Sequence, residues 1–363
     1  MIKKHNFGAG PCILPASVLE KAASAVINWN QNGLSILEVS HRSEEFEAVI
    51  QKTEQLVKDL LKVPDDYAIL FLQGGASTQF SMLPLNFLAQ KASYLDTGFF
   101  AQKAIKEARL FGAVEVVASS REKNYTYIPQ TYEVCLSSSY LHLTSNNTIE
   151  GTEIFDFPQV SVPLICDMSS DIFSRVIDVS QFDLIYAGAQ KNMGPAGMTL
   201  IIAKNSFLDS AKELVPSMSD YRIFRDSKSM FNTPPVFSIY AAMLNLEWLS
   251  EIGGVEEIEK LNIEKARLLY DELDQSKIFQ ATVHGTSRSR MNVTFTARNP
   301  EIESGFLKFI ADKGIIGIRG YRTVGGFRVS LYNALPLASV QVLVSLMKQF
   351  EQMVIQENSS III

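Results

Sequence analysis

The chain has 363 residues with a formal net charge of -6, and 47% of the residues are hydrophobic. This composition is typical of a globular protein with a large core, and the length predicts two domains. The acidic balance, with no run of basic residues, argues against binding to nucleic acid. No apolar stretch is long enough for a signal peptide or a membrane span, so we expect a cytoplasmic protein without membrane association.

The cysteines and histidines are few and scattered. The three cysteines, Cys12, Cys135 and Cys166, lie far apart without the spacing of metal ligands, and the four histidines form no cluster. So few thiols in a long chain are typical of a reducing compartment. The sequence therefore predicts no metal site.

Apolar strands and amphipathic helices alternate from residue 44 onward. Apolar residues at three- and four-residue steps predict a helix over 44–62, and a break at Pro64 precedes a buried strand over 67–72. The same reasoning predicts strands at 92–95, 114–118, 140–143, 162–166, 182–186 and 198–203, and helices at 79–88 and 99–111. Nearly continuous apolar strands between helices predict an α/β fold with a mostly parallel sheet covered on both faces.

The alternation restarts on a smaller scale in the C-terminal third. After Pro234-Pro235, helices are predicted at 236–252, 255–273, 301–313 and 337–355, with strands at 291–296 and 327–332. We expect a large domain over 16–260, and a smaller α/β domain formed by 1–15 with 261–363. The residues from Asn358 onward are expected to form a loosely held tail.

A glycine-rich turn lies between the strand at 67–72 and the next helix. Its sequence is Gly74-Gly75-Ala76-Ser77-Thr78. Backbone N–H groups at such a turn, together with the helix dipole, are suited to an anion, and Ser77 and Thr78 add hydroxyl donors. Taken alone, the turn is more typical of an ordinary strand-to-helix connection than of an anion site, and it lacks the lysine of a P-loop.

Two further residues follow apolar strands. Asp167 ends the strand at 162–166, where open α/β sheets bind their ligands, and Lys191 follows the strand at 182–186 among small residues and turn formers. The interval between them is long enough for one helix and one further strand. A partly desolvated lysine has a lowered pKa, which imine chemistry requires. A phosphate cradle, a carboxylate and an imine-forming lysine together favour pyridoxal 5′-phosphate as cofactor.

Seven motifs in one order along the whole chain resemble those of the phosphoserine aminotransferases, a family of fold-type I pyridoxal phosphate enzymes. They are Asn6-Phe7-Gly8-Ala9-Gly10-Pro11, Ser40-His41-Arg42-Ser43, the turn at Gly74, Asn146-Asn147-Thr148-Ile149-Glu150-Gly151, the stretch from Tyr186 to Gly197, Asn232-Thr233-Pro234-Pro235, and Val324-Gly325-Gly326-Phe327-Arg328. The resemblance implies a seven-stranded large domain. It also implies reversible transamination of 3-phosphohydroxypyruvate with glutamate in serine biosynthesis. Use of the same chemistry in pyridoxine biosynthesis stays open.

The resemblance also implies residue roles. Lys191 forms the imine and Asp167 pairs with the pyridine nitrogen. The other implied cofactor contacts are Ala76, Ser77 and Gln190 at the phosphate, Thr148 at the ring oxygen, Phe100 stacked on the ring, and Asn232 with Thr233 reaching the phosphate of the neighbouring subunit in a homodimer. His41, Arg42, Arg322 and Arg328 are the implied substrate-binding positions. Arg328 is expected to bind the substrate α-carboxylate, and Arg42 with Arg322 the distal anion, because guanidinium groups form bidentate contacts with such anions.

Three positions depart from the pattern of the family. Phe100 stands where tryptophan is common, Tyr321 where some members have histidine, and Ser77 where some have arginine. With fewer cations near the distal anion, we expect weaker selectivity for phosphate.

Four other functions are compatible with parts of the sequence. One is another small-domain pyridoxal phosphate enzyme such as an alanine–glyoxylate aminotransferase, and another is a cysteine desulfurase, for which Cys135 is the candidate nucleophile. The third is a regulatory protein that binds the cofactor or an anion without catalysis, which would not need the arginines. The fourth is a nicotinamide-dependent oxidoreductase, which the glycine spacing disfavours.

Overall fold

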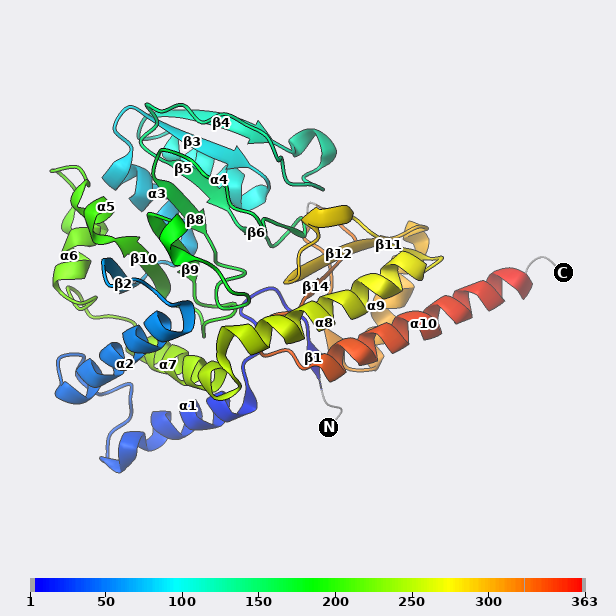
Figure 1. The fold of residues 1–363 in the computed structure, drawn as a ribbon. Coiled ribbons are helices and arrows are strands. Elements are labelled where there is room, and N and C mark those ends of the chain that lie inside the picture. The colour runs from blue at the N-terminus through cyan, green and yellow to red at the C-terminus, as the bar shows by residue number, and fades with distance from the viewer. Residues whose placement is uncertain (1–3, 323, 361–363) are drawn as a thin grey trace.

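The computed structural model describes residues 4–322 and 324–360, which form a large and a small α/β part (Figure 1). The large part contains a seven-stranded sheet in the order β2-β10-β9-β8-β5-β3-β4. β10 is antiparallel to both of its neighbours, and the pairs from β9 to β4 are parallel. The strands are β2 (Tyr67–Leu72), β3 (Lys91–Asp96), β4 (Ala113–Ser119), β5 (Leu141–Thr144), β8 (Leu164–Asp167), β9 (Leu184–Gly188) and β10 (Thr199–Lys204).

Helices cover both faces of this sheet, because its strands bury side chains in both directions. Along β2, Ile69 and Phe71 join a core with α1, α2 and α7, whereas Leu70 and Leu72 join a second core with α3 to α6. The helices are α1 (Ala16–Asn28), α2 (Glu44–Leu61), α3 (Gly75–Phe87), α4 (Phe99–Ala108), α5 (Asn205–Asp209), α6 (Tyr221–Asp226), α7 (Val236–Glu251) and α8 (Gly254–Gln275). Burial on both faces is the arrangement that the apolar strands predicted.

Two predicted connections differ from the structure. The segment between Asp167 and Lys191 contains no α-helix, only a 3-10 turn at Val179–Gln181 before β9. Ser174 Oγ in this segment donates a hydrogen bond to the backbone carbonyl of Asp171, and such local bonds compete with helix formation. Helix α3 begins at Gly75, whereas the sequence predicts a start at residue 79. The first turn was missed because it consists of small residues and shows no apolar periodicity.

The small part has a separate core. Its three-stranded antiparallel sheet, in the order β11-β12-β14, packs against helices α8, α9 and α10, and its core also takes in Phe7 from the N-terminal arm. The elements are β1 (His5–Asn6), β11 (Phe279–Ala281), β12 (Asn292–Ala297), α9 (Glu303–Asp312), β13 (Ile315–Ile316), β14 (Phe327–Ser330) and α10 (Leu337–Ser360), with β1 parallel to β13. The predicted tail at Asn358 is wrong as far as Ser360, because α10 continues to that residue; the rest of it lies outside the described residues.

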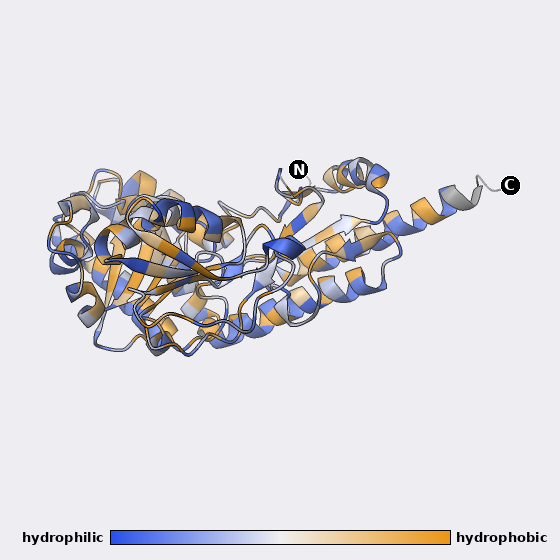
Figure 2. Cartoon of the chain, turned by 90° about the horizontal axis from the view of Figure 1, so that it is seen from above, coloured by the Kyte–Doolittle hydropathy of each residue, from blue (hydrophilic) through white to orange (hydrophobic). Residues whose placement is uncertain are grey.

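Helix α8 belongs to both cores. Val255 and Ile258 pack in the core of the large part, and Ala266 and Leu269 pack in the core of the small part. We propose the domain boundary near residue 260, within this helix. Figure 2 shows hydrophilic and hydrophobic residues alternating along the helices of the small part. Among residues 4–322 and 324–360, no helix is long and apolar enough to cross a membrane.

Candidate active site

Lys191 lies in the turn after β9, where its side chain is almost wholly buried. Its Nζ donates a hydrogen bond of 2.7 Å to Oγ1 of Thr148. Burial lowers the pKa of Lys191 to about 8, although the nearby carboxylate of Asp167 acts in the opposite direction. A substantial fraction of the amine is therefore neutral near physiological pH, as a nucleophile requires.

Asp167 ends β8, the strand next to β9 in the sheet. Its Oδ1 accepts a hydrogen bond of 2.9 Å from the backbone N–H of Ser169. Burial raises the pKa of this carboxyl, and the hydrogen bonds from Ser169 and the charge of Lys191 act against the increase. A buried carboxyl of this kind is well placed to pair with a protonated ring nitrogen.

An aromatic ring and an arginine complete the surroundings of Lys191. The Phe100 ring centroid lies 5.5 Å from Nζ of Lys191. Arg328, on β14 of the small part, is near enough for its charge to lower the pKa of Lys191, and its own Nε is buried without a hydrogen-bond partner among residues 4–322 and 324–360. Burial also lowers the pKa of Arg328. An unpaired buried guanidinium N–H is available for an incoming anion.

The N-terminus of α3 has the features of an anion cradle. Gly74 has a positive φ of 96°, and no side chain caps the helix. The backbone N–H groups of the first turn, which includes Ala76 and Ser77, are therefore without helical partners, and the helix dipole favours a negative charge there. Gln190 is half-buried beside Lys191.

The remaining predicted residues lie farther out. Asn232 and Thr233 are exposed in the loop before α7, and Gln73 Nε2 donates to the Thr233 carbonyl at 2.5 Å. His41 has a buried Nε2 without a hydrogen-bond partner, and Arg42 and Arg322 are exposed. Within the described residues, the contacts of the Lys191 amine include none of these five side chains, so their predicted roles stay predictions.

Sequence reasoning missed several residues at this site. The backbone N–H of Cys12 donates to the Gln190 carbonyl at 3.0 Å, and its thiol donates to the Lys191 carbonyl. Asn192 Oδ1 accepts a 3.0 Å bond from the backbone of Asn333 in the small part. The one sequence signal that points to Asn192 is its position directly after Lys191. The contacts of Cys12 depend on long-range packing.

The fold and the site define a class of protein, and comparison with known proteins identifies it. The chain matches the model of the class-V aminotransferase family over residues 4–343 and belongs to that family. The phosphoserine aminotransferase of Flavobacterium psychrophilum is 53% identical over 353 residues, which cover 96% of this chain and 99% of that protein. The relative from Parabacteroides distasonis, also a phosphoserine aminotransferase, is 53% identical and covers 97% of this chain and 99% of its own length.

Solved structures agree. The phosphoserine aminotransferase of Bacillus circulans subsp. alkalophilus has a TM-score of 0.95 at 44% identity, covering 97% of this chain and 99% of that one. Its pyridoxal phosphate-bound counterpart from Trichomonas vaginalis has a TM-score of 0.92 at 36% identity, covering 95% and 100%. The predicted family and fold class are confirmed.

Proposed function

We propose that this chain is a phosphoserine transaminase that depends on pyridoxal phosphate. It transfers an amino group between L-glutamate and 3-phosphohydroxypyruvate, giving O-phospho-L-serine and 2-oxoglutarate in L-serine biosynthesis. The observation that carries the proposal is the buried, weakly basic Lys191, set between Asp167, Thr148 and Phe100 in a chain 53% identical to a phosphoserine aminotransferase.

The residues present fit the cofactor. Lys191 would bind its aldehyde and Asp167 its protonated ring nitrogen, because both side chains are buried, Asp167 at the end of β8 and Lys191 in the turn after the neighbouring strand β9. The uncapped N-terminus of α3, with Ala76 and Ser77, suits the phosphate, with Gln190 nearby. When bound, pyridoxal phosphate supplies an aldehyde that combines with amines and a ring that accepts electrons.

The chain's own residues perform the remaining tasks. Lys191 Nζ, as a neutral amine, would act as the base that takes a proton from the substrate Cα and as the acid that gives it back. Thr148 orients Nζ through its 2.7 Å hydrogen bond. The burial of Lys191 and Asp167 excludes water from the reacting groups, which strengthens every charge interaction there.

Substrate recognition is assigned to the arginines. Arg328, with its unpaired Nε, would bind the α-carboxylate. The distal anion would be bound by Arg42 and Arg322, with His41 beside them. Tyr321 packs against Phe99, with ring centroids 5.3 Å apart, so the loop that carries Arg322 reaches the N-terminal end of α4.

The first test is spectroscopic. The purified protein is loaded with pyridoxal phosphate, and its visible absorption is recorded before and after addition of L-phosphoserine, L-serine or L-alanine. Loss of the visible band with phosphoserine alone supports the half-reaction and the distal anion site. An equal response to alanine would mean that Tyr321 and Ser77 have relaxed the selectivity, and a wild-type chain that never binds the cofactor would refute the proposal. Phosphohydroxythreonine, added in the same way, tests the pyridoxine branch.

A homodimer forms part of the proposal, with Asn232 and Thr233 reaching the partner's cofactor phosphate. Both residues are exposed, and Phe231 beside them is 41% exposed. Mixing a K191A chain with an N232A/T233A chain tests this arrangement. If the loop acts across subunits, each mixed dimer has one intact site and activity recovers. If the loop acts within its own subunit, no site is intact and mixing restores nothing. We propose a cytoplasmic location.

The alternative function, alanine–glyoxylate transamination, has weaker support. The alanine–glyoxylate aminotransferase of Nostoc sp. has a TM-score of 0.74 at 16% identity, a likeness that extends to the fold alone. The absorption experiment separates the two, because alanine is the expected amino donor of the alternative and phosphoserine of the main proposal.

A further inference from the structure

The tight turn between β6 (Asn146–Asn147) and β7 (Thr152–Glu153) contacts two parts of the active site at once. Thr148 in this turn accepts the hydrogen bond from Lys191 Nζ. Two residues later, Oε1 of Glu150 accepts a 2.7 Å hydrogen bond from the backbone N–H of Phe99, the first residue of α4. The turn therefore links Lys191 to the helix that carries Phe100.

Helix α4 depends on this contact because it has no cap of its own. Gly98, which precedes the helix, offers no side chain, and no other side-chain cap is present. A Cβ at Gly98 would lie 2.6 Å from Oε2 of Glu150 and 2.7 Å from Oδ1 of Asn147. Glycine at this position therefore allows Glu150 to approach the helix end and act as a cap from a distant segment.

Glu150 is held firmly but its charge is not paired. Only 9% of the residue is exposed, and Oε2 has no hydrogen-bond partner in the part of the chain that the structure describes. Burial raises the pKa of Glu150 to about 7, although the N–H of Phe99 and the charge of Arg328 act against the increase. Because the carboxyl is partly neutral at physiological pH, accepting a hydrogen bond is a larger part of its role than carrying a charge.

The backbone of Glu150 is fixed from the small part. Thr294 on β12 donates a hydrogen bond of 2.9 Å from Oγ1 to the Glu150 carbonyl. Thr294 is the residue on β12 that pairs with Arg328 on β14. One turn thus contacts the amine of Lys191, the start of α4 and the strand next to the arginine.

We propose that Glu150 is a positioning residue that holds Phe100 over the cofactor ring by capping α4 through the Phe99 N–H. This inference rests on the proposed function, since it requires that the ring of pyridoxal phosphate lies against Phe100. Glu150 itself touches neither substrate nor cofactor in this role. Its effect is to fix the first turn of α4 relative to Thr148 and Lys191.

The test uses the full chain with E150A, which removes the acceptor, and E150Q, which keeps an acceptor of the same shape without the charge. Visible circular dichroism of the bound cofactor is measured because it depends on how the ring is held. We expect E150A to change the visible bands and to raise the cofactor dissociation constant about fivefold, the effect of losing one helix cap. E150Q should stay close to wild type. Hydrogen exchange of the cofactor-free protein should show faster exchange at the start of α4 in E150A alone.

Glu153 supplies a control, since it is also a buried carboxyl, 2% exposed, but contacts Arg175 rather than α4. E153Q should lower the melting temperature and leave the visible bands unchanged. The inference is overturned if E150A keeps the wild-type bands, if E150Q changes them as strongly as E150A, or if E153Q changes them equally. Should E150A fail to fold, G98A disturbs the same contact from the other side, and unchanged bands in G98A would also overturn it. Failure of the wild-type chain to bind the cofactor would instead refute the proposed function.

Discussion

The ionisation of Lys191 is decided by competition between burial and a neighbouring carboxylate. Burial has the larger effect, so the pKa falls to about 8 even though Asp167 stabilises the charged form. The same lysine on the surface would be almost fully protonated at neutral pH and a poor nucleophile. The buried position of the turn after β9 therefore lowers the pKa of the Lys191 amine.

The lowered pKa predicts how the stability of the cofactor-free protein depends on pH. The folded chain binds fewer protons than the unfolded chain between pH about 8 and 10.5, so the free energy of unfolding rises with pH in this window. At pH 7, K191M should be more stable than wild type by on the order of 3 kcal/mol, since one pKa unit corresponds to about 1.4 kcal/mol. Urea denaturation at pH 7 and above pH 10 measures the difference, which should largely disappear at the higher pH. A difference independent of pH would contradict this prediction.

Asp167 offers a second prediction at the same scale. D167N keeps the shape of the side chain but removes the charge that would face a protonated ring nitrogen. Loss of one partner from a buried ion pair costs about 3 kcal/mol or more, so turnover should fall at least about a hundredfold. Steady-state kinetics of the loaded enzyme measures the effect, with S169A as a control that keeps the carboxylate. Activity of D167N within a few-fold of wild type would exclude the assigned role.

At the scale of elements, the turn before α3 provides a matched pair of glycines. Gly74 and Gly75 both have positive φ, at 96° and 68°, which costs other residues about 1–2 kcal/mol. A Cβ at Gly74 would also lie 2.1 Å from Oγ1 of Thr78, whereas nothing lies within 4 Å of one at Gly75. G74A should therefore lower the melting temperature more than G75A and weaken phosphate binding at the helix end. Thermal unfolding of both variants, with and without inorganic phosphate, measures this; equal losses would contradict it.

The elements also show what the sequence can predict. The strand at Tyr67–Leu72 was predicted within its observed limits, and α2 to within one residue, because each has a clear apolar period and a clear break. Lys191 and Asp167 follow such strands, so the position of each at the edge of the sheet could also be predicted. The turn at Ser169 could not be predicted from the sequence, because the Ser169 hydroxyl accepts its hydrogen bond from Gly188, far along the chain. For the same reason Glu150 was recognised only as part of a motif.

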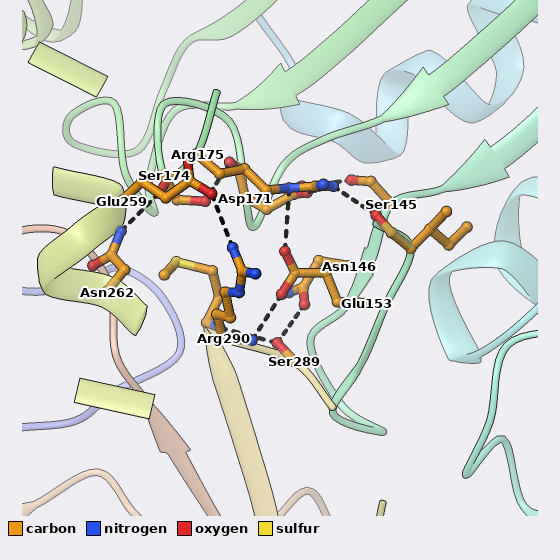
Figure 3. A network of polar contacts seen from close by, with 12 residues as sticks. Ser145, Asn146, Glu153, Asp171, Ser174, Arg175, Glu259, Asn262, Ser289 and Arg290 are labelled. Carbon is orange, nitrogen blue, oxygen red and sulfur yellow. Dashed lines mark hydrogen bonds and ion pairs between the residues drawn. The ribbon is translucent and has the colours of Figure 1, made fainter. Parts of the chain in front are cut away.

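At the scale of the whole molecule, a buried polar network joins the two parts (Figure 3). Arg175, after β8, forms ion pairs of 3.2 Å with Glu153 and 3.0 Å with Asp171. Glu153 also accepts a hydrogen bond of 2.7 Å from the backbone of Arg290, just before β12 of the small part. Arg290 in turn pairs with Glu259 on α8 at 2.9 Å. The network therefore ties the turn after β8 in the large part to the start of β12 and to α8.

R175M should show how much this network contributes. The variant leaves the carboxyls of Glu153 and Asp171 buried without their cation, which costs about 3–5 kcal/mol. Burial already raises the pKa of Glu153 while the charge of Arg175 lowers it, so loss of Arg175 raises it further. The folded variant then binds more protons than the unfolded chain above the usual pKa of glutamate, so its stability falls as the pH rises.

The destabilisation of R175M relative to wild type should therefore be larger at pH 8 than at pH 5.5. Urea unfolding at both values measures the difference, with R290M as the control. The Arg290 side chain is 32% exposed and Glu259 25%, so loss of this ion pair should cost only about 1 kcal/mol. Its dependence on pH should be weaker than that of R175M, because the charge of Arg290 lowers the pKa of Glu153 less than the charge of Arg175 does. If R175M lost no more stability than R290M, the buried carboxyls would be satisfied by other groups. Equal losses for R175M at both pH values would show that Glu153 does not take up a proton when the cation is removed.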